Sequence, residues 1–128
     1  LFLVFIVSMC VTAIAAVKRQ VHQDYSSMSG GAQTVFTVTT GKDMDLKTII
    51  FNATNSSATV AAFQLKDSAS VFQTFHLSDK EASGYSKTIN QTIDFDEPWT
   101  VNDNVILSLS AGHSSSVSAS ITIIGTER

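Results

Sequence analysis

The chain has 128 residues, a formal net charge of -3 and only 15% charged residues, a balance without the basic patch that marks nucleic-acid-binding proteins. Its hydrophobic content of 44% argues against a disordered chain and predicts a packed core. The single cysteine, Cys10, excludes both an intrachain disulfide and a cysteine-rich zinc site.

The first seventeen residues, LFLVFIVSMCVTAIAAV, carry no charge, and the first charged residues are Lys18 and Arg19. No Gly or Pro interrupts the chain before Gly30, so we predict one long helix over residues 1–28. A helix that is apolar on every face has to be buried on every face, in a membrane or against other copies of itself. We therefore expect an assembly helix that makes its contacts through Leu1, Phe2, Val4, Phe5, Ile6, Val11, Ile14 and Val17.

Two other interpretations of this segment stay open. Ala13, Ile14 and Ala15 resemble the small-residue cleavage pattern of a secretory signal peptide. The second interpretation is a plain membrane anchor. It conflicts with Lys18 and Arg19, because positive residues after a span favour the cytoplasmic side, whereas the rest of the chain looks extracellular. We expect the segment to be retained in the mature chain and to lie in the membrane before assembly.

From Gln33 onward the hydrophobic pattern changes to the alternation of β-strands, after a glycine hinge over residues 29–32. About seven strands separated by turn residues are typical of an antiparallel β-sandwich. The predicted strands cover residues 33–40, 46–52, 58–66, 70–77, 84–95, 104–111 and 115–124. The predicted fold class is therefore α+β, with the hydrophobic helix over residues 1–28 followed by a sandwich domain over residues 33–128.

Three N-glycosylation sequons lie within the predicted sandwich, at Asn52, Asn55 and Asn90. Modified asparagines have to face solvent outside the cell, so the sequons predict an extracellular glycoprotein with N-glycans. Asn52 and Asn55 stand so close together that we do not expect both to be modified.

No motif predicts catalysis, and we expect no enzyme activity, cofactor or metal. His113 precedes three serines, but no nucleophile elbow accompanies it. We expect Trp99 in the core rather than in a recognition patch with Phe95 and Tyr85. One oxygen-rich stretch consists of Asp94, Asp96, Glu97, Asn102, Asp103 and Asn104. We expect a solvated loop there rather than a calcium site, because the spacing of these residues is not that of an EF-hand.

An apolar N-terminal helix that passes directly into a sandwich with sequons resembles the archaeal type IV pilins and archaellins. The resemblance rests on Leu1 to Val17 and on the order of the domains. It implies a structural subunit of a cell-surface filament that serves adhesion or motility, with the helices of identical copies bundled in the core and the glycosylated sandwich outside. Bacterial type IV pilins are a poorer match, because Phe5 stands where they usually carry a glutamate.

Residues 35–66 also resemble the small sandwich modules of virion and tail accessory proteins, which share a cadence of strand, glycine turn and I-x-x-N-x-T/S. This second resemblance implies a membrane-anchored minor capsid or tail accessory protein. The filament interpretation makes other copies of the chain the partners of the helix. The virion interpretation surrounds the helix with lipid and gives the sandwich capsid proteins as partners.

Overall fold

The described part of the chain consists of β-strands and their connections. The computed structural model describes residues 15–26, 28, 32–56, 61–68, 70–77, 84, 86–102, 106–111 and 117–128, with only the backbone described for residues 106–111. No helix occurs within these ranges. The eight strands are β1 (Val17–Tyr25), β2 (Ala32–Thr37), β3 (Met44–Asn55), β4 (Ala61–Asp67), β5 (Ser70–Leu77), β6 (Lys87–Val101), β7 (Ile106–Ala111) and β8 (Val117–Glu127).

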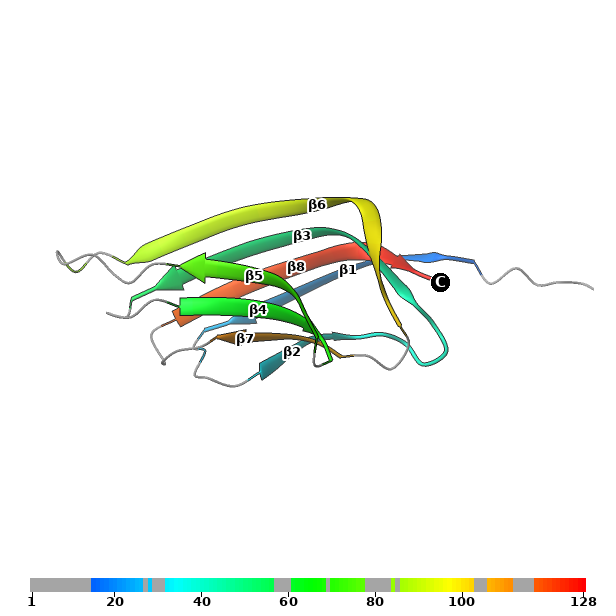
Figure 1. Cartoon of the computed structure of the whole chain (residues 1–128), viewed down its shortest axis with the longest axis horizontal. Coiled ribbons are helices and arrows are strands. Elements are labelled where there is room, and N and C mark those ends of the chain that lie inside the picture. The colour runs from blue at the N-terminus through cyan, green and yellow to red at the C-terminus, as the bar shows by residue number, and fades with distance from the viewer. Residues whose placement is uncertain are drawn as a thin grey trace, which may run out of the picture.

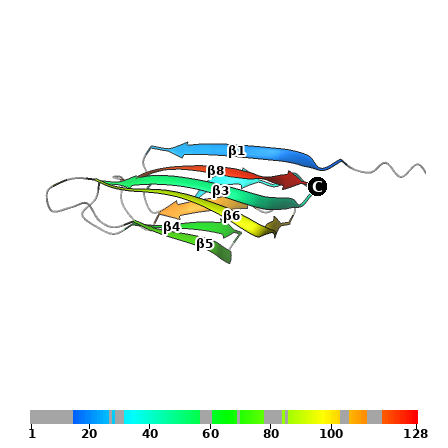
Figure 2. The ribbon, with the colours of Figure 1, turned by 90° about the horizontal axis from the view of Figure 1, so that it is seen from above.

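The strands form two four-stranded antiparallel sheets that pack face to face (Figures 1 and 2). Sheet A has the strand order β1-β8-β3-β6, and sheet B has the order β2-β7-β4-β5. Successive side chains of a strand point to opposite faces, so each central strand gives one face to the core. In β8 every second residue from Val117 to Glu127 is buried, while the residues between them are only partly covered.

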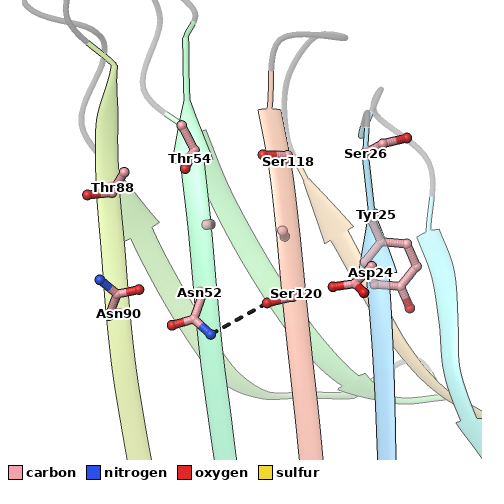
Figure 3. Close-up of a pocket in the computed structure, with 11 residues that line it drawn as sticks. Asp24, Tyr25, Ser26, Asn52, Thr54, Thr88, Asn90, Ser118 and Ser120 are labelled. Carbon is pink, nitrogen blue, oxygen red and sulfur yellow. Dashed lines mark hydrogen bonds between the residues drawn. The ribbon is translucent and has the colours of Figure 1, made fainter.

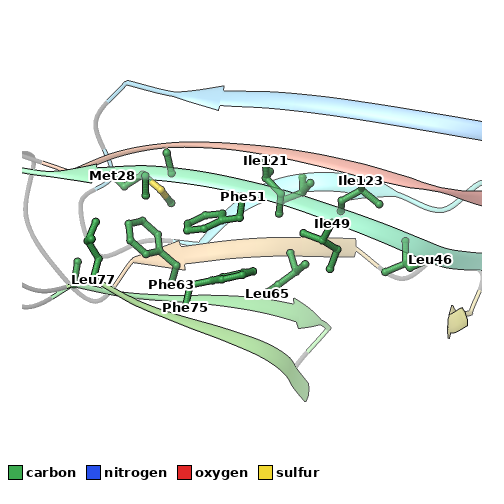
Figure 4. Packing of buried hydrophobic residues seen from close by; sticks show 14 of the residues in the cluster. Met28, Leu46, Ile49, Phe51, Phe63, Leu65, Phe75, Leu77, Ile121 and Ile123 are labelled. Carbon is green, nitrogen blue, oxygen red and sulfur yellow. The ribbon is translucent and has the colours of Figure 1, made fainter. Parts of the chain in front are cut away.

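Three phenylalanines from both sheets organise the core. Phe51 of β3 stacks on Phe75 of β5 with ring centroids 4.2 Å apart, and it meets Phe63 of β4 edge-on at 5.0 Å (Figure 4). All three side chains are at most 1% exposed. Aromatic rings bury more apolar surface than other side chains, so this cluster contributes much of the free energy that holds the sheets together.

The structure corrects the predicted α+β class, because the described part of the chain is all-β and the segment predicted to end the helix is a strand. β1 pairs with β8 over nine residues, from Val17 opposite Glu127 to Tyr25 opposite Ala119. Within β1, Val21, Gln23 and Tyr25 are partly buried and the residues between them are exposed. The absence of Gly and Pro allowed a helix here, but the period of two in these side chains fits the edge that β8 offers.

Most residues of the predicted assembly helix lie outside the described residues, namely Leu1, Phe2, Val4, Phe5, Ile6, Val11 and Ile14. Val17 opens β1 and is 44% exposed. Across the described ranges, no helix has the length and apolar character needed to cross a bilayer. The predicted hinge also lies outside them except for Ala32, which opens β2. The sandwich therefore begins at residue 17 and not at residue 33.

Each of the seven predicted strands overlaps one observed strand, from β2 to β8. The largest difference is β6, which continues through Pro98 to Val101. Its register against β3 shifts between Asp94 and Trp99, so Pro98 stands in an irregular part of the ladder. A residue without an N–H is tolerated at such a bulge on an edge strand.

Candidate functional site

The outer face of sheet A carries rows of hydroxyl and amide side chains. The antiparallel register sets residues of β1, β8, β3 and β6 side by side across the whole sheet. One row consists of Asp24, Ser120, Asn52 and Asn90, and the next row contains Ser118, Thr54 and Thr88.

The two rows line an open groove of about 470 Å³ near one end of sheet A (Figure 3). Asn52 Nδ2 donates a hydrogen bond to Ser120 Oγ at 3.5 Å across the groove. Asp24 is the only charged side chain among the lining residues. The lining is completed by Tyr25, Ser26, Ala53 and Ala119.

Tyr25 connects this end of sheet A to sheet B. Its hydroxyl donates a hydrogen bond to the carbonyl oxygen of Thr34 on β2 at 3.0 Å. Partial burial raises the pKa of Tyr25, so the hydroxyl stays protonated and remains a donor well above neutral pH. Gln23 makes a second bond of this kind, from Nε2 to the carbonyl oxygen of Val35 at 3.3 Å.

The three predicted glycosylation residues occupy different environments. Asn90 is exposed on the edge strand β6, and Asn52 lies directly opposite it on β3 and is partly buried. Both line the groove. Asn55 points into the sandwich and is 0% exposed. A glycan on Asn55 does not fit this fold, whereas Asn52 and Asn90 both open to solvent.

The groove offers hydrogen-bonding groups and little charge. Hydroxyl and amide side chains both donate and accept hydrogen bonds. The lining residues include no His, Lys or Cys beside the serines, and a serine without an adjacent base is a weak nucleophile. Such a surface suits ordered water or a neutral ligand that carries hydroxyl groups.

A second polar cluster lies beside the groove. In it a hydroxyl, a histidine and a carboxylate contact one another in the same order as in a catalytic triad. His22 Nδ1 is 2.8 Å from Thr122 Oγ1, and His22 Nε2 is 3.2 Å from Asp24 Oδ2. The His22 and Asp24 side chains are 52% and 76% exposed, so neither is held in a water-excluded site. β8 lies between β1 and β3, so its backbone N–H groups pair within the sheet and are not available as oxyanion donors. The sequence could not indicate this cluster, because 100 positions separate His22 from Thr122.

The most buried charged side chain of the described residues lies at the other end of sheet A. Glu127 of β8 is 0% exposed and accepts hydrogen bonds from Thr39 N at 2.7 Å and from Arg19 Nε at 2.8 Å. The hydrogen bonds from Thr39, supported by Arg19, hold the pKa of Glu127 below the ordinary value of a glutamate. The carboxylate thus ties β1 and the segment after β2 to β8.

Asp45 is the centre of a neighbouring ionic cluster. Arg128 Nε donates to Asp45 Oδ2 at 2.7 Å, and Thr100 Oγ1 donates to Asp45 Oδ1 at 2.7 Å. Both bonds lower the pKa of Asp45, and the Arg128 bond is the larger cause. The backbone groups of Asp43 and Arg128 also exchange two hydrogen bonds, at 2.9 and 3.0 Å. These interactions fasten the end of β8 to the start of β3.

Among the residues that the structure describes, the other candidates do not come together as a site. Across the described residues, no three His, Cys, Asp or Glu side chains gather in a way that could hold a metal. Asp94 accepts a hydrogen bond from Thr48 Oγ1 at 2.7 Å. Trp99, expected in the core, is 42% exposed and stacks on Phe72 of β5 with centroids 5.3 Å apart. Outside the described residues lie Tyr85, Asp103, Asn104 and His113.

A comparison with known protein families finds no matching family model, and a comparison with curated proteins finds no matching sequence.

Proposed function

We propose that the chain is a structural subunit of an extracellular assembly, with the sandwich as its exposed module and with no catalytic role. The observation that carries this proposal is the outer face of sheet A, where hydroxyl and amide side chains, with Asp24 as the single charged group among them, line an open groove near one end of the sheet. The carboxylates whose pKa is lowered, Asp45 and Glu127, lie away from that groove and join strands to one another. These two carboxylates therefore support the fold.

An accessory module of a virion or tail is the form of this role that the strand β1 favours. A pilus-like core helix over residues 1–28 needs residues 17–25 as its last turns, but these residues pair with β8. A sandwich that begins at Val17 fits an accessory module, which needs only a compact domain and a point of attachment.

A cell-surface filament is the second candidate, favoured by the positions of Asn52 and Asn90. Both side chains open onto the same solvent-facing groove, where glycans could cover the outside of a polymer. In this form the partners are other copies of the chain.

Immunogold electron microscopy on material from the native source tests the proposal. Antibodies raised against the folded chain should label regular structures, with label on particles supporting the virion form and label along fibres supporting the filament form. Recovery of the chain only as free, unassembled molecules would overturn the structural role.

A further inference from the structure

The two sheets have four edge strands, and β1 is the one whose ladder is regular throughout. The ladders of the other three edge strands each contain a register shift. In β2 it lies between Thr34 and Phe36, and in β6 it lies between Asp94 and Trp99. The shift in the ladder of β5 lies between Leu65 and Lys66 of its partner β4. Bulges of this kind protect an edge from pairing with another chain. β1 pairs with β8 over nine residues without a shift and contains neither Gly nor Pro.

Within the described strands, β1 has an unpaired outer side, and side-chain contacts hold the strand in a fixed position. β1 is the terminal strand of sheet A, and no other described strand pairs with its outer side. Arg19 is anchored on buried Glu127, while Gln23 and Tyr25 are bonded to backbone oxygens of β2. A strand held from both sheets presents its free backbone groups with little further loss of conformational entropy on pairing.

The charges of β1 are self-complementary when two copies pair antiparallel about Val21. A two-fold axis through that residue sets Lys18 of each copy opposite Asp24 of the other, so two pairs of opposite charge form at once. It also sets Gln20 opposite His22 on the same face. Moving the centre to Gln20 sets Lys18 opposite His22, and moving it to His22 sets Gln20 opposite Asp24. Either shift loses both pairs of Lys18 with Asp24.

We propose that β1 is a homotypic assembly edge, which joins sheet A of one chain to sheet A of a second copy in an antiparallel pair centred on Val21. The pairing makes a continuous eight-stranded sheet and brings the two outer faces to the same side of it. Asp24 lies at the end of the polar row that contains Asn52, so the polar rows of the two copies meet across the new edge. The contact is small, so we expect association in the micromolar range.

Cross-linking of the full chain in a mild detergent tests the pairing directly. A carbodiimide joins an amine to a carboxylate without a spacer, and Lys18 and Asp24 are about 20 Å apart along one strand. A link between these two side chains therefore has to join two molecules. In a mixture of unlabelled and ¹⁵N-labelled chains, we expect Lys18–Asp24 linked peptides of mixed isotope content. Absence of such peptides at concentrations up to the millimolar range would overturn the proposal.

Charge exchange supplies the matched test, with sedimentation velocity in the same detergent as the readout. Lys18→Asp and Asp24→Lys should each weaken dimerisation at least tenfold, because each sets like charges opposite each other. The double variant Lys18→Asp/Asp24→Lys should restore it. Lys42→Asp makes the same charge change beyond β2, away from the edge, and should leave dimerisation unchanged. Dimers that persist in both single variants would contradict this register.

The β1 pairing goes beyond the proposed structural role, and different measurements test the pairing and the role. A chain that never dimerises through β1 loses the pairing, while immunogold label on fibres or particles would still support the structural role.

Discussion

At the scale of single residues, Glu127 shows how this small sandwich tolerates a buried charge. The carboxylate is removed from water but receives hydrogen bonds on both oxygens, from Thr39 N on Oε1 and from Arg19 on Oε2. A buried charge is stable only when its hydrogen bonds are made. The residue therefore acts as a tie between strands.

Replacing the carboxylate of Glu127 with the neutral amide in Glu127→Gln should lower the free energy of unfolding by about 2 kcal/mol at neutral pH. The folded-state pKa of Glu127 is lowered, so its stabilisation is complete above the ordinary pKa of a glutamate and is lost as pH falls through the folded pKa. The variant should therefore lose less stability on acidification than the native chain, with Asp45 supplying part of the remaining slope. Urea unfolding at several pH values measures both effects.

Glu97→Gln is the matched control, because Glu97 is exposed on β6 and the same atoms change. Its free energy of unfolding should stay within about 0.5 kcal/mol of the native value. Equal destabilisation by the two substitutions would show that the buried hydrogen bonds of Glu127 contribute nothing specific.

The sequon asparagines give a prediction about modification. In a host that performs N-glycosylation, we expect glycans on Asn52 or Asn90 and none on Asn55 in the folded protein, because Asn55 is 0% exposed. Asn52 and Asn90 are directly opposite on neighbouring strands, with Cβ atoms about 5 Å apart, so two glycans on one molecule should be rare. Mass spectrometry of glycopeptides measures the occupancy, and a well-occupied Asn55 in folded material would contradict the assignment of its side chain to the core.

At the scale of the strands, the phenylalanine cluster connects β3 of sheet A with β4 and β5 of sheet B. Phe51→Ala removes the ring that contacts both others and should lower the free energy of unfolding by about 4 kcal/mol. Trp99→Ala is the control, because that ring is 42% exposed and should cost clearly less. Urea unfolding curves give both values, and similar losses would mean that Phe51 is not central to the core.

The alternation of side chains predicts several strands from local sequence alone. In β8, the alternation of apolar residues and serines sets Val117, Ala119 and Ile121 on one face, and all three are buried. The burial of Asn55 could be read from the same rule, because a strand continued past residue 52 sets Phe51 and Asn55 on one face. The predicted strand ends at Asn52, whereas β3 continues to Asn55.

β1 and the groove were not predictable in the same way. The alternation in β1 follows directly on a long apolar run, and the strand forms because β8 lies beside it. The groove depends on the register of four strands that are distant in sequence, which no local pattern specifies. The triad-like order of His22, Thr122 and Asp24 arises from the same register.

At the scale of the whole molecule, the two ends of sheet A differ. One end is fastened by the ionic contacts of Glu127 and Asp45, and the other opens into the polar groove. Sheet A is therefore held firmly at one end and presents hydrogen-bonding groups at the other. This division fits a subunit whose polar groove serves contact while Glu127 and Asp45 serve the fold.

Residues 17–25 form an integral strand of the sandwich, and the all-β class, the favoured form of the structural role and the assembly edge all depend on this strand. Residue-resolved hydrogen exchange by NMR at low protein concentration tests this claim most directly. We expect alternation along β1, in which amides that face β8 exchange slowly and the amides between them exchange quickly. Uniformly fast exchange over residues 17–25, or unbroken slow exchange of the kind that a helix shows, would contradict it.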